Sequence, residues 1–212
     1  KFETNFTFSS IEYIHFSRSV DSILRILVCL KHAHPFFIID SNWPKHYQQT
    51  FQLYINDLNP GLLDHSFLIA TSGSTGSSKL CLHSIESLLI SAKRSLMLCS
   101  LHNIDANVVS LSPTQMGGLA VIAKSIVSKT PMLIFSSTWR NCFNVTHNLH
   151  FTMVPQQFSR LLEFTEHNAD YNRMITSVLI GGDFLSPDLR HLIPPLPYDI
   201  YYGYGSTETC AQ

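Results

Sequence analysis

One short stretch concentrates the groups that a phosphate ester needs as binding partners. It follows the apolar residues 67–70, is rich in hydroxyls and glycine, and ends in a lysine. Its members are Thr71, Ser72, Gly73, Ser74, Thr75, Gly76, Ser77, Ser78 and Lys79. Glycines let backbone N–H groups turn toward one ligand, hydroxyls add short donors, and an ammonium adds positive charge. We therefore expect the polyphosphate tail of a nucleotide to bind here.

Two other interpretations of this stretch must be weighed. A Walker-type NTPase loop requires Gly-x-x-x-x-Gly-Lys-Ser/Thr and a helix that starts at the lysine. Gly73, Gly76 and Lys79 have a different spacing, and the Leu-Cys-Leu of residues 80–82 favours a short strand. The plainer alternative is a loop without a ligand, because clusters of Ser, Thr and Gly usually mark loops.

A second motif near the C-terminus, residues 201–209, also follows an apolar segment and reads Tyr-Tyr-Gly-Tyr-Gly-Ser-Thr-Glu-Thr. The ring of Tyr204 offers a face for a nucleobase, and Gly203 and Gly205 permit close approach of the backbone. Thr207 and Glu208 can meet a phosphate and its Mg²⁺. The two motifs together predict a nucleotide site more specifically than either does alone.

With both motifs the chain resembles the adenylate-forming superfamily of acyl-CoA synthetases, luciferases and peptide-synthetase adenylation domains. That family carries Thr-Ser-Gly-Ser/Thr-Thr-Gly-x-Pro-Lys and, later, Tyr-Gly-x-Thr-Glu. Three intervening segments, residues 111–118, 150–155 and 178–182, are similar to family segments in the same order. The resemblance covers almost the whole chain.

The resemblance implies a role for each matched residue. The loop residues Thr71, Ser72, Gly73, Ser74, Thr75, Gly76 and Lys79 would hold the β- and γ-phosphates of ATP. Tyr204, flanked by Gly203 and Gly205, would stack on adenine, while Thr207 would touch the α-phosphate and Glu208 would bind Mg²⁺. The acid substrate would lie near Gln115, Gly181 and Gly182. The implied cosubstrates are ATP, CoA and a small carboxylic acid, joined through an acyl adenylate.

Within the superfamily the chain most resembles bacterial o-succinylbenzoate-CoA ligases of menaquinone synthesis. The similarity lies in residues 70–84, 153–158 and 204–210. Other interpretations stay open: another acyl-CoA synthetase acting on a fatty or aromatic acid, a non-catalytic nucleotide- or acyl-binding remnant, or an α/β domain with an incidental loop.

The chain also departs from the family pattern. Ser78 replaces a proline and Leu80 a glycine, so the loop is expected to be less rigid. Gln115 stands where the family has an aromatic residue or histidine, and Asp183 stands where a small apolar residue is frequent. Compared with the family, we expect the lysine-bearing C-terminal domain to be missing. We therefore expect an incomplete AMP-binding N-terminal domain, with weak or no turnover by these residues alone.

Composition sets further limits on the function. The chain has 212 residues, 45% of them hydrophobic, which suffices for a sizeable core. The formal net charge of -1 gives no reason to expect nucleic acid as a partner. Apolar runs are too short for a membrane span and no signal peptide is visible. Five cysteines without metal or disulfide spacing indicate reduced, buried thiols, and so we expect a cytoplasmic protein.

The elements that position these motifs alternate along the chain. We expect helices at residues 19–32, 84–101, 118–127 and 155–164, and strands at residues 36–40, 67–70, 80–82, 108–111, 132–135, 151–154, 175–180 and 198–202. This order predicts an α/β fold with mostly parallel sheets and helices on both faces, as in part of the large N-terminal domain of an adenylate-forming enzyme. Residues 1–63 and 64–212 form possible lobes. Ligands of such folds bind where strands end.

Overall fold

The computed structural model describes residues 11–17, 19–71, 79–99, 101, 104–134, 139–191 and 193–211. The chain divides into two compact units, Lys1–Glu86 and Ser87–Gln212. The possible lobes expected from the sequence divide instead between residues 63 and 64. The units divide later because strands at residues 66–70 and 80–84 belong to the sheet of the first unit.

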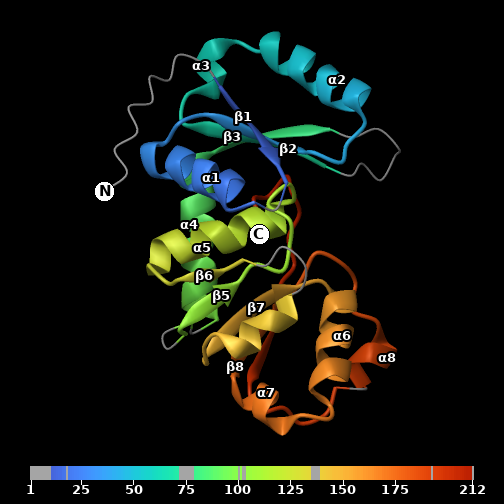
Figure 1. Ribbon diagram of the computed structural model, residues 1–212. Helices are drawn as coiled ribbons and strands as arrows, with labels where there is room; N and C mark the ends of the chain where they lie inside the picture. The colour runs from blue at the N-terminus through green and yellow to red at the C-terminus, as the bar shows by residue number, and fades with distance from the viewer. Residues whose placement is uncertain are drawn as a thin grey trace. The chain divides into compact units, whose positions relative to one another are not determined.

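The first unit is built on a four-stranded sheet of order β1-β2-β3-β4. Its strands are β1 (Glu12–Phe16), β2 (Phe36–Asp40), β3 (Ser66–Ala70) and β4 (Leu80–Ser84). The β1, β2 and β3 strands are parallel, and β4 pairs antiparallel with β3. Figure 1 shows helices α1 (Val20–His32) and α2 (Lys45–Asn56) on opposite faces of this sheet, with the short α3 (Pro60–Leu63) before β3.

Alternation along the strands decides which side chains each helix covers. Phe37 and Leu68 pair across β2 and β3 and share a buried cluster with Phe51 and Ile55 of α2. Side chains of successive strand residues point to opposite faces of the sheet. In β1, Glu12 therefore faces α1, and its neighbour Tyr13 faces α2. Both helices therefore bury an apolar stripe against one sheet.

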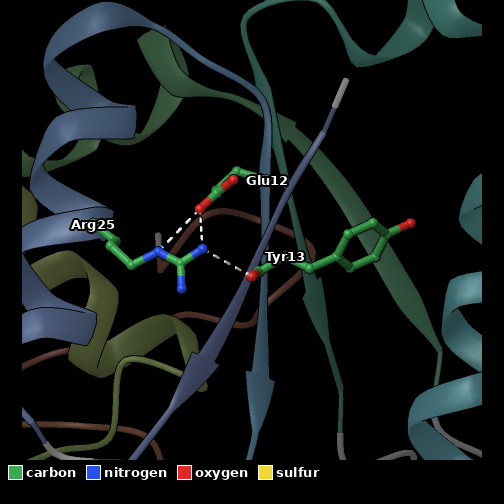
Figure 2. Close-up of polar contacts among 3 residues, drawn as sticks. All are labelled: Glu12, Tyr13 and Arg25. Atoms are coloured by element: carbon green, nitrogen blue, oxygen red, sulfur yellow. Dashed lines mark hydrogen bonds and ion pairs between the residues drawn. The ribbon is translucent and has the colours of Figure 1, made fainter. Parts of the chain in front are cut away.

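An ion pair ties α1 to the first strand. Arg25 of α1 donates from Nε to Oε1 of Glu12 at 2.9 Å, and its Nη2 contacts the same oxygen. Figure 2 shows the guanidinium between the Glu12 carboxylate and the backbone oxygen of Tyr13, which lies 3.5 Å from Nη2. The pair is part-buried, so it orients α1 on the sheet as well as adding a modest attraction.

The second unit contains a five-stranded parallel sheet of order β6-β5-β7-β8-β9. Its strands are β5 (Ala106–Val108), β6 (Met132–Leu133), β7 (Leu149–Met153), β8 (Ile175–Ile180) and β9 (Asp199–Tyr202). The remaining helices are α4 (Ile85–Leu98), α5 (Met116–Ser128), the 3-10 helix η1 (Trp139–Asn144), α6 (Pro155–Thr165), α7 (Ala169–Arg173) and α8 (Pro187–His191).

The central strand β7 divides its side chains between two helices. Phe151 and Met153 join the buried cluster that contains Phe158 and Leu161 of α6. The intervening Thr152 accepts a hydrogen bond from Lys124 of α5. Helices therefore cover both faces of this sheet too, and the expected fold class, an α/β fold with mostly parallel sheets, is confirmed.

Several element boundaries differ from the expected ones; for example, the strand expected at residues 151–154 lies at Leu149–Met153, and the helix expected at 118–127 spans Met116–Ser128. The strand expected at residues 108–111 lies at Ala106–Val108, because the polar Asn107 is fully buried and donates from Nδ2 to Ser125 Oγ at 2.9 Å. The helix expected to reach residue 101 ends at Leu98. The expected strand at 175–180 agrees with β8. Within the described ranges, none of the helices combines the length and hydropathy that crossing a membrane requires.

Candidate functional site

The ends of the parallel strands in the second unit are joined by hydrogen bonds that extend beyond the strands. Ser110 Oγ, after β5, donates to Thr152 O at 2.6 Å, and Gly181 N donates to Met153 O at 3.0 Å. Gly203 N donates to Ile180 O at 2.8 Å. The turns after β5, β7, β8 and β9 are therefore held along one edge of the sheet, where α/β folds bind ligands.

Two of these turns approach each other closely at glycine positions. A Cβ atom on Gly181 would lie 3.2 Å from the carbonyl oxygen of Gly203. Gly182 has a φ of +78°, a left-handed backbone that other residues rarely adopt. The Gly-Gly pair predicted from the sequence thus serves to bring the β8 and β9 turns together.

A cavity of about 410 Å³ lies between these turns. It is lined by glycine, aromatic, aliphatic and charged residues, namely Ile180, Gly182, Asp183, Phe184, Leu185, Arg190, Tyr202, Gly203, Tyr204 and Gly205. Tyr204 is 97% exposed, which excludes a role as a core aromatic. Exposed rings beside flat glycine backbone suit a planar aromatic ligand, so the residues present fit a nucleobase.

A compact turn follows the cavity and carries the two residues expected to handle phosphate and metal. Ser206 N donates to Thr209 Oγ1 at 3.0 Å, and Ala211 N donates to Ser206 O at 3.0 Å. Ser91 of α4 donates to Cys210 O at 2.8 Å and anchors the end of the turn. Thr207 and the exposed Glu208 lie within this turn, directly after the cavity lining.

The expected phosphate loop belongs to the first unit, where the structure describes its two ends. Thr71 N donates to Lys79 O at 2.8 Å, which extends the β3–β4 pairing by one step beyond Ala70 and Leu80. Lys79 is exposed and is followed by strand β4 rather than a helix, so the Walker arrangement is excluded. The intervening Ser72, Gly73, Ser74, Thr75 and Gly76 lie outside the described residues.

Gln115, expected on the acid side of the site, is the N-cap residue of α5 and is exposed. Its side chain makes no capping bond, while its carbonyl accepts from Gly118 N at 3.1 Å. It does not line the cavity of about 410 Å³ formed by the β8 and β9 turns. The structure therefore leaves its amide exposed at the start of the helix.

A buried polar cluster on the opposite side of β7 was not predicted. Lys124 of α5 is 1% exposed, and its Nζ donates to Thr152 Oγ1 at 2.7 Å. The same Nζ lies 3.4 Å from Nε2 of His150, whose Nδ1 lies 2.8 Å from Ser177 Oγ. One signal was available in the sequence: a single lysine within the apolar residues 119–127.

Burial controls the protonation of this cluster. Desolvation lowers the pKa of Lys124 to about 8, although the nearby Cys99 acts in the opposite direction. Desolvation, followed by the charge of Lys124, lowers the pKa of His150 well below its usual value. The imidazole is therefore neutral at physiological pH and can accept from the ammonium.

The described residues also define what the site offers a metal ion. No group of three or more His, Cys, Asp or Glu side chains gathers in this part of the chain. Mg²⁺ is commonly held by one or two carboxylates together with substrate phosphates and water. A single exposed carboxylate such as Glu208 fits that mode, in which the nucleotide supplies the other ligands.

Sequence comparison places the chain in a known family of proteins. The family model described as AMP-binding enzyme matches residues 38–212. A curated relative, the 2-succinylbenzoate–CoA ligase of Haemophilus influenzae, is 26% identical over 141 residues, which make up 65% of this chain and 30% of the relative. The matched segment thus spans less than a third of that relative's length.

Solved structures share the fold. MenE of E. coli, as a variant with bound OSB-AMS, has a TM-score of 0.78 and 19% identity, and covers 96% of this chain and 51% of its own. The o-succinylbenzoate coenzyme A synthetase (MenE) of Bacillus subtilis with ATP and magnesium ion has a TM-score of 0.78 and 17% identity, with the same coverage. Apo MatB from Rhodopseudomonas palustris has a TM-score of 0.79 and 13% identity, and this chain spans about half of its length.

Proposed function

We propose that this chain, which belongs to the family of AMP-binding enzymes, binds ATP. It would then activate a small carboxylic acid as an acyl adenylate for transfer to CoA. The observation that carries the proposal is the cavity between the β8 and β9 turns, with its exposed Tyr204 and close glycine backbone. An adenine ring needs an aromatic face and room to approach the backbone, and both are present.

Each part of the nucleotide has candidate partners in the chain. Adenine would stack against Tyr204 in the cavity, and the turn that follows would bring Thr207 to the α-phosphate. Lys79 and Thr71, at the base of the Ser/Thr/Gly loop, would take part in holding the β- and γ-phosphates. Mg²⁺, when bound at Glu208, would neutralise charge on the phosphate oxygens.

The proposed reaction is the one expected of an AMP-binding enzyme that forms an acyl adenylate. The carboxylate of the acid attacks the α-phosphorus, pyrophosphate leaves, and the thiol of CoA then displaces AMP from the acyl carbon. Negative charge grows on phosphate oxygens in the first step, so fixed donors such as the Thr207 hydroxyl and the Lys79 ammonium would stabilise it. The Gly181–Gly182 turn and Gln115 would border the acid.

For the acid itself we propose o-succinylbenzoate, or a related aromatic acid with a second carboxylate. Support comes from the Haemophilus influenzae relative, which acts as a 2-succinylbenzoate–CoA ligase, and from the two MenE structures with the same fold. This part of the proposal includes a role in menaquinone synthesis and a place in the cytoplasm.

Two measurements test the proposal. Isothermal titration with Mg-ATP should show binding at one site, and acid-dependent exchange of labelled pyrophosphate into ATP should report adenylate formation. Failure to bind Mg-ATP would reject the proposal as a whole. Binding without exchange on any acid would leave a nucleotide-binding protein without ligase activity. A panel of acids assayed with CoA tests the substrate, and a preference for fatty acids would exclude o-succinylbenzoate.

A further inference from the structure

The same cavity contains two charged side chains that the proposed reaction does not use. We propose that Asp183 and Arg190 read the edge of the nucleobase and select adenine over guanine. This inference rests on the proposed function, because it assumes that a nucleobase occupies the cavity. Both residues line it together with Tyr202 and Tyr204.

Arg190 is held in the cavity by an aromatic contact. It belongs to α8, its backbone N donates to Ser186 O at 3.0 Å, and its Cζ lies 5.5 Å from the ring centre of Tyr202. A guanidinium over a ring is attracted by the π-electrons and keeps its planar set of N–H donors. Tyr202 is 52% exposed, so this pair lies at the border of the cavity rather than in the core.

Asp183 is fixed by its own turn. It follows Gly182, whose left-handed backbone directs the chain around the end of β8. Its Oδ1 accepts from the backbone N of Phe184 at 2.7 Å, which fixes the carboxylate beside the cavity. An ionised carboxylate only accepts hydrogen bonds and has about four lone-pair sites. One site is used by Phe184 N, and the others remain able to accept from a ligand.

The Asp183 carboxylate, an acceptor, and the Arg190 guanidinium, a donor, line the same cavity and match the hydrogen-bonding groups at the edge of adenine. Adenine offers an exocyclic amino group as donor and ring nitrogens as acceptors, whereas guanine has a carbonyl oxygen at the position of that amino group. The Asp183 carboxylate would accept from the amino group of adenine and repel the carbonyl of guanine. The Arg190 guanidinium would donate to a ring nitrogen.

The decisive experiment removes the proposed hydrogen bond between Asp183 and the amino group of adenine, once by changing the protein and once by changing the nucleotide. Dissociation constants are measured for ATP, GTP and purine riboside triphosphate, which lacks the exocyclic amino group, with the unaltered protein and with Asp183→Ala. Loss of a hydrogen bond to a charged group should weaken ATP binding about ten- to a hundredfold. Purine riboside triphosphate should bind both proteins equally. If the substitution only distorted the turn, binding of all three nucleotides would weaken alike, and that result would overturn the inference for Asp183.

A second pair of variants tests Arg190. Arg190→Ala should weaken ATP binding about tenfold, and Arg190→Lys should restore only part of the loss, because a lysine lacks the planar donor set. Arg160→Ala, an exposed arginine on α6 of the same unit, is the matched control and should change nothing. Equal affinities for Arg190→Ala and the control would overturn the role of Arg190.

The outcomes separate this inference from the proposed function. If the unaltered protein binds none of the three nucleotides, the proposed function fails and the inference fails with it. If the unaltered protein binds ATP, and the Asp183→Ala and Arg190→Ala variants keep the same preference for ATP over GTP, the proposed nucleotide site stands. The proposed roles of Asp183 and Arg190 in selecting adenine are then rejected. Asp183→Asn offers one more check: its amide can donate to the guanine carbonyl, so the preference for ATP over GTP should shrink.

Discussion

Lys124 Nζ lies 3.4 Å from His150 Nε2 inside the second unit, and both side chains are 1% exposed. Two protonated groups at this distance would repel strongly in a medium of low polarity. The pair is compatible with burial because the imidazole stays neutral and the ammonium also donates to Thr152 Oγ1 at 2.7 Å. The polar cluster thus joins α5 to β7 and, through Ser177, to β8.

Protonation of Lys124 makes the stability of the second unit depend on pH. The pKa of Lys124 is lowered to about 8 in the folded chain, whereas an unfolded lysine keeps an ordinary value. Between these two values the unfolded state binds more protons, so the free energy of unfolding rises with pH. The rise from Lys124 is at most about 3 kcal/mol, and denaturant unfolding at a series of pH values measures it.

Lys124→Met provides the reference for this measurement. Methionine has a similar length and no charge, so the rise above pH 8 should be missing from the variant. The difference between the two proteins isolates Lys124 from groups such as Cys29 and Cys142, whose pKa values burial raises to about 12. If the free energies of unfolding of the two proteins changed with pH in parallel, Lys124 would stay charged in the folded chain over the whole pH range measured.

Gly118→Ala should disrupt the start of α5. A Cβ atom there would lie 2.2 Å from the carbonyl oxygen of Ser112, and backbone must move to relieve such a contact. Overpacking of this kind costs about 1–3 kcal/mol, so the chain should unfold at lower denaturant concentration. Gly117→Ala is the control, because its Cβ would meet only the side chain of Leu111, at 3.1 Å. An equal loss in both variants would contradict the packing argument.

Lys79→Ala should weaken Mg-ATP binding without altering the fold. The ammonium is exposed and the backbone carbonyl of Lys79 keeps its bond from Thr71 N, so the sheet should be unaffected. A hydrogen bond between charged groups contributes about 1.5–3 kcal/mol, which corresponds to a ten- to hundredfold higher dissociation constant. Calorimetry with Mg-ATP measures it, and Lys45→Ala, another exposed lysine in the same unit, should bind normally.

Two substitutions of Tyr204 distinguish stacking from other contacts. Tyr204→Phe keeps the ring and should bind ATP nearly as well as the unaltered protein. Tyr204→Ala removes the ring and should lose about 1–3 kcal/mol of binding free energy, the usual value for stacking of a base on an aromatic side chain. Because Tyr204 is 97% exposed, the melting temperatures of both variants should stay the same. Equal binding by all three proteins would remove Tyr204 from the site.

Sequence periodicity predicted the elements with strong apolar patterns. The strand at residues 175–180 and the helices near residues 20–32 and 116–128 were found close to their expected positions. Helix α2 was not predicted, because only Phe51 and Ile55 of its twelve residues are buried and the rest are largely polar. Strand β1, Glu12–Phe16, was not predicted either.

The residues that line the cavity could be predicted only where a sequence motif marked them. Gly182, Gly203, Tyr204 and Gly205 meet in one cavity, as their places at strand ends suggested. Arg190 was not predicted, because no motif surrounds it and its place depends on how the chain returns from α8 to β9. Lys124 was missed for a different reason, since a lysine in a helix is normally solvated and only tertiary packing buries this one.

The hydrogen bond from Thr71 N to Lys79 O continues the antiparallel pairing of β3 and β4 and so brings the two ends of the connection between these strands together. The entropic cost of joining two paired strands changes slowly with the length of the connection, by about 0.6 kcal/mol for each doubling. Residues 72–78 should therefore be exchangeable for longer, shorter or heterologous sequences at little cost to folding. Replacing these residues would therefore allow nucleotide affinity to be varied while strands β3 and β4 are retained.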